Sequence, residues 1–274
     1  MKSMQGGSKR KSRWRRRAGL DGGIQQVGEA LRQAERILII TGAGLSADSG
    51  LPTYRGVGGL YNGHTEDGLP IEAALSGPML DLDPALCWKY LAEIGRACMT
   101  AKPNVGHLAI AELQRRKPDC WVLTQNVDGY HLAAGSPPQR LIEIHGTFAP
   151  LFCMVCGQEG AELASHLIRP LPPRCANCSG VLRPPVVLFE EMLPDLALGR
   201  LQAQLLEGFD VVVAVGTSAS FAYIVEPLLR VRNSGGFTAQ IDPAASELSL
   251  LVDVHIAEAA SDVLPRLVRH IYTD

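Results

Sequence analysis

Four of the seven cysteines have the spacing of a metal site. Cys153 and Cys156 form one close pair, and Cys175 and Cys178 form a second pair that is separated from the first by 18 residues. Two turns that each supply two thiolates can complete the tetrahedron of a zinc ribbon, and such zinc is structural because no ligand position stays open. Two redox pairs are the alternative, but neither pair follows a strand and opens a helix. The odd number of cysteines and their pairing favour metal binding in a reducing compartment over a disulfide framework.

A glycine-rich loop follows the apolar run at residues 36–41. Its sequence, GAGLSA at 42–47, fits the pattern G-x-G-x-x-A, in which glycines allow a tight turn and let backbone N–H groups approach a pyrophosphate. The acidic residue that dehydrogenases carry about 20 positions later is missing, as is the lysine of a Walker loop. The loop predicts a dinucleotide site of another kind, and an ordinary strand–glycine–helix turn is the alternative.

Polar side chains also follow two further apolar runs. Residues 124–131 read TQNVDGYH and residues 143–146 read EIHG, which place amide, carboxylate and imidazole groups where strands are expected to end. Such convergent polar groups are typical of a ligand site. From these residues alone, a structural role for the lone His145 stays open.

The elements that must position these groups alternate between helix and strand. Apolar runs without alternation, separated by amphipathic helices, predict a parallel sheet covered on both faces, with ligands at the carboxyl ends of its strands. Residues 153–185 break this rhythm and are interpreted as an inserted module. We expect helices around residues 24–34, 86–97, 107–115 and 262–271, and strands at 36–41, 120–124, 141–144, 210–215 and 237–241.

Charge divides the 274-residue chain into a basic start and an acidic body. Residues 1–20 hold eight basic side chains and no acidic one, whereas the other 254 residues carry 18 basic and 28 acidic side chains. The acidic body argues against nucleic acid as its partner. We interpret the basic segment as a disordered arm, with targeting or polyanion binding as alternatives. The absence of a long apolar run or an export signal predicts no membrane partner and a cytoplasmic location.

Taken together, these motifs resemble the sirtuin family of NAD-dependent protein lysine deacylases. The resemblance covers residues 24–271 and rests on GAGLSADSGLPTYR at 42–55, TQNVDGYH at 124–131, HG at 145–146, the four cysteines and GTS at 216–218. It implies a Rossmann-like parallel sheet with helices on both faces and a small zinc-ribbon module at about residues 150–186. The catalytic domain would then span residues 21–274, and the cofactors would be NAD and structural zinc.

The resemblance also implies roles for individual residues. Gln125 and Asn126 would hold the nicotinamide ribose, and Asp128 would bind the nicotinamide carboxamide. His145 would be the general base and Asn126 would assist catalysis: as nicotinamide leaves, the acyl oxygen attacks C1′ of the ribose, and the base then takes a proton from a ribose hydroxyl. The remaining NAD contacts would come from Gly42, Ala43, Gly44, Ser46, Tyr54, Arg55, Gly216, Thr217, Ser218, Asp242 and Ala260.

Three positions depart from the family pattern, and at one of them Tyr54 replaces the usual phenylalanine and keeps the ring. The segment at residues 183–191 resembles the one that binds the substrate backbone as an added strand, with contacts from Val187, Phe189 and Glu190. Glycine is usual where Glu190 stands, so this residue puts the ordinary peptide geometry in doubt and favours substrates with basic flanks. Asp242 replaces an asparagine, but a carboxylate still accepts hydrogen bonds from ribose hydroxyls.

The substrate implied by the family is a protein or peptide that carries an acylated lysine. Sirtuins that prefer succinyl- or malonyl-lysine carry a Tyr-x-x-Arg pair on the helix before a Pro-Asn-x-Gly-His segment, here residues 103–107. The corresponding positions, counted without gaps, are Leu91 and Ile94, so we expect neutral acyl groups such as acetyl or longer apolar chains. Arg96 lies nearby, and a shift of two residues in the helix register would weaken this expectation.

Two other functions compete with deacylation. A mono-ADP-ribosyltransferase could use the same scaffold if a protein nucleophile, rather than the acyl oxygen, captured C1′; Glu190 beside the cleft keeps this open. A zinc-ribbon binding module without catalysis is the second alternative. The combination of His145, Asn126 and Asp128 argues against it.

Overall fold

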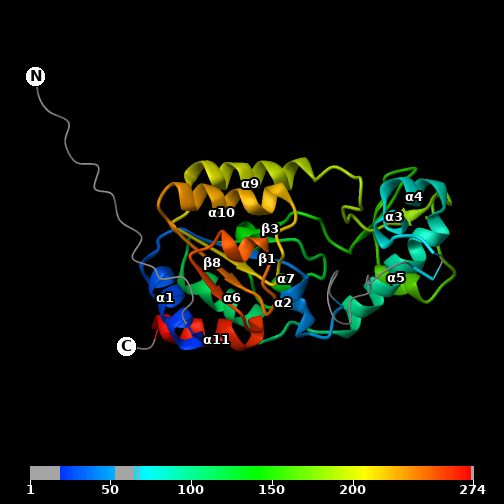
Figure 1. Cartoon of the computed structure of the whole chain (residues 1–274). Coiled ribbons are helices and arrows are strands. Elements are labelled where there is room, and N and C mark those ends of the chain that lie inside the picture. The colour runs from blue at the N-terminus through cyan, green and yellow to red at the C-terminus, as the bar shows by residue number, and fades with distance from the viewer. Residues whose placement is uncertain (1–18, 53–64, 67, 273–274) are drawn as a thin grey trace, which may run out of the picture.

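A six-stranded parallel sheet forms the centre of the larger of two units (Figure 1). The computed structural model describes residues 19–52, 65–66 and 68–272. The strand order is β3-β2-β1-β7-β8-β9, and every neighbouring pair is parallel. The strands are β1 (Ile37–Thr41), β2 (Cys120–Thr124), β3 (Leu141–Glu143), β7 (Val211–Val215), β8 (Phe237–Ile241) and β9 (Val254–Ile256).

Helices cover both faces of this sheet, which explains why β1, β2 and β7 are apolar with little alternation. In β1, Ile37 and Ile39 pack into one core while Leu38 and Ile40 pack into the other, because successive side chains point to opposite faces. The first core is covered by α1 (Leu20–Gln33), α6 (Val105–Arg116) and α11 (Ala260–Tyr272). The second is covered by α9 (Asp195–Glu207) and α10 (Ala222–Asn233), which lie on the opposite side of the sheet in Figure 1.

The smaller unit is built from two separate stretches of chain that share one hydrophobic core. Trp88 is fully buried in this core, and its Nε1–H donates to the Leu182 carbonyl oxygen at 2.9 Å, which ties the first stretch to the second. The first stretch contains α3 (Ile71–Ala74), α4 (Gly77–Leu82) and α5 (Pro84–Thr100). The second contains β4 (Leu151–Cys153), β5 (Glu159–Ala161), α8 (Leu163–Leu167) and β6 (Leu182–Arg183), with its strands antiparallel in the order β5-β4-β6. The module predicted at residues 150–186 corresponds to the second stretch alone, and the domain boundaries stay a prediction.

The predicted fold class is confirmed, with differences in individual elements. The strands expected at 120–124 and 237–241 have those bounds, whereas the other three are shorter by one residue. Sequence patterns did not predict α9, α10 or β9. Short connecting elements complete the described chain: α2 (Ala43–Ala47), α7 (Tyr130–Ala133), and the 3₁₀ turns η1 (Pro138–Arg140) and η2 (Glu247–Leu250). None of the described helices combines the length and the apolar character needed to cross a membrane.

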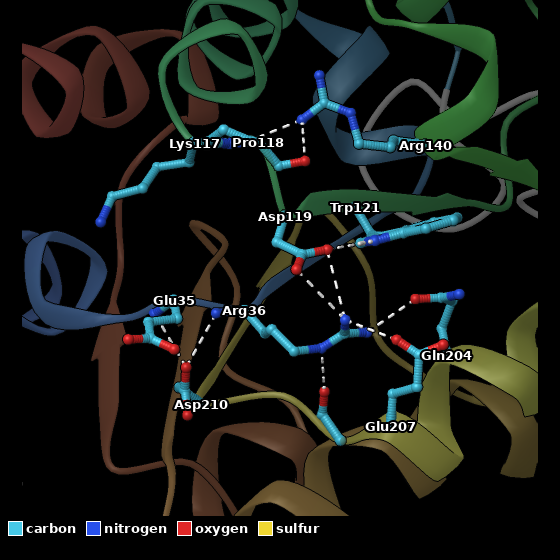
Figure 2. Close-up of polar contacts among 11 residues, drawn as sticks. Glu35, Arg36, Lys117, Pro118, Asp119, Trp121, Arg140, Gln204, Glu207 and Asp210 are labelled. Atoms are coloured by element: carbon cyan, nitrogen blue, oxygen red, sulfur yellow. Dashed lines mark hydrogen bonds and ion pairs between the residues drawn. The ribbon is translucent and has the colours of Figure 1, made fainter.

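A polar cluster around Arg36 connects the amino ends of β1, β2 and β7 through hydrogen bonds and ion pairs (Figure 2). The Arg36 guanidinium donates to the Gly208 carbonyl oxygen and to Gln204 Oε1, both at 2.8 Å, and pairs with Glu207 at 2.7 Å. It also lies 5.2 Å from the centre of the Phe209 ring. This cluster lies at the edge of the sheet opposite the glycine-rich loops, so it stabilises the sheet without contacting the predicted cofactor site.

Replacing Arg36 with alanine is expected to lower the free energy of unfolding by about 2–3 kcal/mol, because several half-buried partners lose their hydrogen bonds at once. Urea unfolding measures this change. The matched control is Arg230→Ala, whose exposed pair with Glu226 on α10 should contribute less than about 1 kcal/mol. Equal destabilisation by the two substitutions would contradict the stabilising role of the cluster. A loss of NAD affinity in the Arg36 variant would contradict its separation from the cofactor site.

Candidate active site

Two glycine-rich turns touch where β1 and β7 end. The Gly44 N–H donates to the Gly216 carbonyl oxygen at 2.9 Å. A Cβ atom added at Gly44 would lie 2.6 Å from Gly216 Cα, and one added at Gly42 would lie 2.8 Å from the Gly216 oxygen. Gly216 also has a φ of +59°, in the region that favours glycine. Side chains here would force the two turns apart, so this close contact requires the glycines that the sequence provides.

The side chain of Asn126 connects the end of β2 to the first glycine loop. Its Nδ2 donates to the Gly42 carbonyl oxygen at 3.0 Å and to Ser46 Oγ at 3.1 Å. Ser46 Oγ donates in turn to Asp128 Oδ2 at 2.6 Å. Burial raises the pKa of the Asp128 carboxyl above its ordinary value, although the hydrogen bonds from Ser46 and from the Tyr130 N–H oppose this shift. This chain of contacts holds an amide, a hydroxyl and a carboxyl group side by side.

Gln125 joins the second glycine turn and the predicted base to the same cluster. The side-chain Nε2 of Gln125 donates to Thr217 Oγ1 at 2.9 Å. The backbone carbonyl oxygen of Gln125 lies 3.0 Å from His145 Nδ1. A carbonyl oxygen only accepts hydrogen bonds, so Nδ1 of His145 carries the hydrogen and Nε2 is the acceptor in the neutral ring. Burial lowers the pKa of His145 below its ordinary value of 6.5, which leaves the ring neutral at pH 7.

An open pocket lies between these loops and α5. Ala43, Ser46 and residues 125–128 line it from the sheet side, all within motifs that the sequence singled out. The lining is completed by Leu51 and Pro52 of the same glycine-rich segment and by Ile94, Ala97 and Cys98. The last three recur at helical spacing on α5, so one face of that helix lines the pocket. The sequence predicts this helix, but only Ile94 among these three residues was connected with the substrate, because an apolar helix stripe looks the same whether it packs into a core or lines a pocket.

The residues predicted to bind the adenosine half lie along the neighbouring strand ends. Gly216, Thr217 and Ser218 follow β7, and Asp242 follows β8, where burial raises the pKa of its carboxyl group. Ala260 is the buried first residue of α11, and the next residue, Ser261, donates its N–H to Asp48 at 3.1 Å. These positions thus share one edge of the sheet with the pocket.

The four paired cysteines form a single cluster in the smaller unit. Their sulfur atoms all lie within 4.8 Å of one another, with Cys153 3.4 Å from Cys178 and Cys156 3.8 Å from Cys175. Four thiolates at zinc–sulfur distances of about 2.3 Å would lie about 3.8 Å apart in a tetrahedron. The donor set and its spacing therefore fit zinc. All four sites are protein ligands, so this zinc is structural.

The predicted substrate segment runs between the two units. The Val187 N–H donates to the His145 carbonyl oxygen at 2.8 Å, and the Phe189 N–H donates to the Leu75 carbonyl oxygen at 3.0 Å. An incoming peptide strand could not use these two donors unless the segment rearranged. Glu190 is exposed and has a φ of +67°, which explains why glycine suits this position.

Some predicted residues lie elsewhere, and some functional candidates were missed. Tyr54 and Arg55 lie outside the described residues. His131, from the predicted polar cluster, is buried with its Nε2 2.9 Å from Thr41 Oγ1, and burial lowers its pKa to about 3, so it is a structural group. Conversely, Tyr223 contacts His145 and was not singled out, because no spacing rule connects residues 78 positions apart.

Comparison with known proteins agrees with this geometry. The profile of the Sir2 family matches residues 42–222, which contain the pocket, His145 and all four cysteines. The chain belongs to the Sir2 family. Among solved structures, a Sir2 homologue in complex with NAD superposes with a TM-score of 0.80 at 32% identity, covering 90% of this chain and 93% of that one. A mutant Sir2 homologue with ADP-ribose gives a TM-score of 0.80 at 33% identity, over 90% of this chain and 95% of that chain.

Bacterial members of the Sir2 family show the activity. A protein of Pseudomonas aeruginosa named NAD-dependent protein deacylase 2 is 67% identical over 91% of this chain and 97% of its own length. A protein of the same name from Pseudomonas syringae is 65% identical over 90% of this chain and 99% of its own length. This Sir2 protein is an NAD-dependent protein deacylase: it transfers the acyl group of a lysine to ADP-ribose and releases nicotinamide. Its cofactors are NAD and structural zinc.

Proposed function

We propose that His145 is the general base of this deacylation and that the pocket beside Asn126 and Asp128 takes the nicotinamide end of NAD. One observation carries the proposal: the contact between Nδ1 of His145 and the Gln125 carbonyl oxygen, at 3.0 Å. This contact holds the ring next to Gln125, which lines the pocket, and leaves Nε2 as the accepting nitrogen. A neutral, partly buried imidazole is suited to take a proton near neutral pH.

The other residues divide the work of binding and orientation. When bound, NAD supplies the ribosyl carbon that accepts the acyl oxygen and the hydroxyl group that gives up its proton. Asn126 and Ser46 already form a hydrogen-bonded pair at the pocket wall, so they present polar groups to a ribose with little rearrangement. Asp128, whose pKa is raised, can hold a carboxamide through either oxygen.

We further propose that the substrate is a lysine carrying a neutral acyl group. A Sir2 enzyme that is 27% identical to this chain, with a TM-score of 0.75, was solved with a myristoylated histone peptide. The pocket-lining residues in the described part of the chain include no lysine, arginine or histidine that could pair with an acidic acyl group. Leu91 is buried in the core of the smaller unit, and Arg96 donates to the Leu167 carbonyl oxygen at 3.0 Å. Ile94 is the one of these three residues that lines the pocket.

A panel of otherwise identical peptides carrying acetyl-, myristoyl- or succinyl-lysine tests this substrate class. With NAD present, we expect the acetyl or myristoyl peptide to be turned over at least about tenfold faster than the succinyl peptide, because a buried carboxylate without a partner is costly. Mass spectrometry follows both the peptide and the ADP-ribose product. Preferential turnover of succinyl-lysine would contradict the neutral-acyl assignment, and ADP-ribose attached stably to protein without loss of acyl groups would support the transferase alternative.

A further inference from the structure

Two aromatic side chains surround the predicted base on the side opposite Gln125. Tyr223, from the first turn of α10, places its hydroxyl oxygen 2.6 Å from His145 Nε2. Phe221, just before the helix, stacks on Tyr223 with ring centres 5.3 Å apart and an angle of 11° between the planes. Both rings meet the imidazole edge to face, with centres 5.9 and 6.0 Å away. The stack therefore fixes where the Tyr223 hydroxyl lies.

The direction of the short hydrogen bond follows from the rest of the ring. Nδ1 of His145 carries the hydrogen that is donated to the Gln125 carbonyl, so Nε2 of the neutral imidazole has only a lone pair to offer. The Tyr223 hydroxyl must therefore donate its hydrogen to Nε2. Its oxygen keeps lone pairs that can accept another hydrogen bond at the same time. Burial raises the pKa of Tyr223 to about 12, so the hydroxyl retains its hydrogen throughout the neutral range.

We propose that Tyr223 is a second catalytic residue of the deacylation and that it relays the proton from a ribose hydroxyl of NAD to His145. In this step the ribose O–H bond breaks and its proton bonds to the Tyr223 oxygen. The original Tyr223 proton moves to Nε2 and makes the ring an imidazolium, while the electron pair stays on the ribose oxygen for attack on the acyl carbon. Tyr223 ends the step neutral. The proposal rests on the base role of His145 described above.

The structure favours a relay because the accepting nitrogen of His145 already accepts a hydrogen bond from the Tyr223 hydroxyl. Direct transfer to Nε2 would first require the Tyr223 hydroxyl to leave, although the stack on Phe221 holds it in place. A relay keeps that bond and strengthens it as the ring gains charge, since hydrogen bonds to charged groups are stronger than neutral ones.

The test is Tyr223→Phe, which keeps the ring and its stacking but removes the hydroxyl. We expect kcat for deacylation to fall about tenfold or more, with the NAD affinity unchanged within about twofold. The solvent isotope effect, followed through mixtures of light and heavy water, should indicate two protons in flight in the natural protein and one in the variant, under conditions where chemistry limits the rate. Tyr272→Phe is the matched control, because it removes a hydroxyl from α11 that accepts and donates no hydrogen bond among the described residues. It should leave both measurements unchanged.

A second measurement needs no NAD. The ¹⁵N chemical shifts of the imidazoles in the unliganded protein report which nitrogen carries hydrogen and whether the other accepts a hydrogen bond. We expect Nε2 of His145 to lose the signature of an accepted hydrogen bond in Tyr223→Phe alone. A kcat in Tyr223→Phe that equals or exceeds that of the natural protein, or an unchanged Nε2 chemical shift, would overturn the relay proposal. Full turnover in a His145 variant would instead refute the base role, so the two failures are distinguishable.

Discussion

His145→Ala is expected to retain NAD binding but to lower the turnover of acyl-lysine peptides by on the order of 100-fold or more. The imidazole contacts Tyr223 and the pocket-lining residue Gln125, so its loss removes the proton acceptor without removing the residues that line the pocket. Calorimetric titration with NAD measures binding, and product analysis by mass spectrometry measures turnover. Near-normal turnover would refute the assignment of the base.

A control and a second variant separate chemistry from folding. His166→Ala removes an imidazole from α8 in the smaller unit and should leave deacylation unchanged within about twofold, since this residue is not at the pocket. His145→Asn keeps a side-chain N–H for the Gln125 carbonyl oxygen but offers no comparable base. It should fold like the natural protein and be nearly as inactive as His145→Ala. Recovery of activity by asparagine would indicate that His145 only orients its neighbours.

Removing the zinc is expected to unfold the smaller unit and to lower deacylation at least about tenfold. Cys153 and Cys175 belong to the core of that unit, and the same core packs α5, whose other face lines the pocket. Structural zinc contributes directly to the folding free energy of such small modules. Zinc analysis before and after treatment with a chelator should show about one ion per chain and then none, with a parallel loss of activity.

Cys175→Ser provides the genetic version of this experiment. It should purify with little zinc and show the same loss, whereas Cys120→Ala, which removes a buried thiol from the core of the larger unit, should keep its zinc. A chelated protein that unfolded cooperatively at an unchanged midpoint and remained active would show that the cysteine cluster is dispensable.

The sequence predicts the sheet well because its strands carry the information locally. β2 (CWVLT) is an apolar run that ends at Thr124, and β8 (FTAQI) is a short segment that lies between Gly236 and Asp242, so their bounds match the prediction. By contrast, α9 buries only Leu201 and Leu205 while Leu196 and Leu206 are exposed, which blurs its helical period. In α10 an internal proline, Pro227, weakens the helix signal.

The candidate site shows the same contrast between residues that local sequence predicts and residues that it does not. Motif residues that follow strand ends, such as Asn126 and His145, are placed together because parallel strands bring their carboxyl ends to one edge. The pocket wall formed by α5 and the contact between Tyr223 and His145 depend on how distant segments pack. The spacing of residues in the sequence does not predict such packing. The positive φ of Glu190 was anticipated only as a departure from the usual glycine.

The division of the fold into two cores gives each unit its own fluorophore. Trp88 is fully buried inside the smaller unit and hydrogen-bonded to the Leu182 carbonyl oxygen. Trp121 lies on β2 of the larger sheet, beside Asp119. Their emission responds to different surroundings, since one indole is completely shielded from solvent and the other is only partly so. With Trp14 and either of these two tryptophans replaced by phenylalanine, the single tryptophan that remains would follow the opening of one unit and reveal which unit unfolds first.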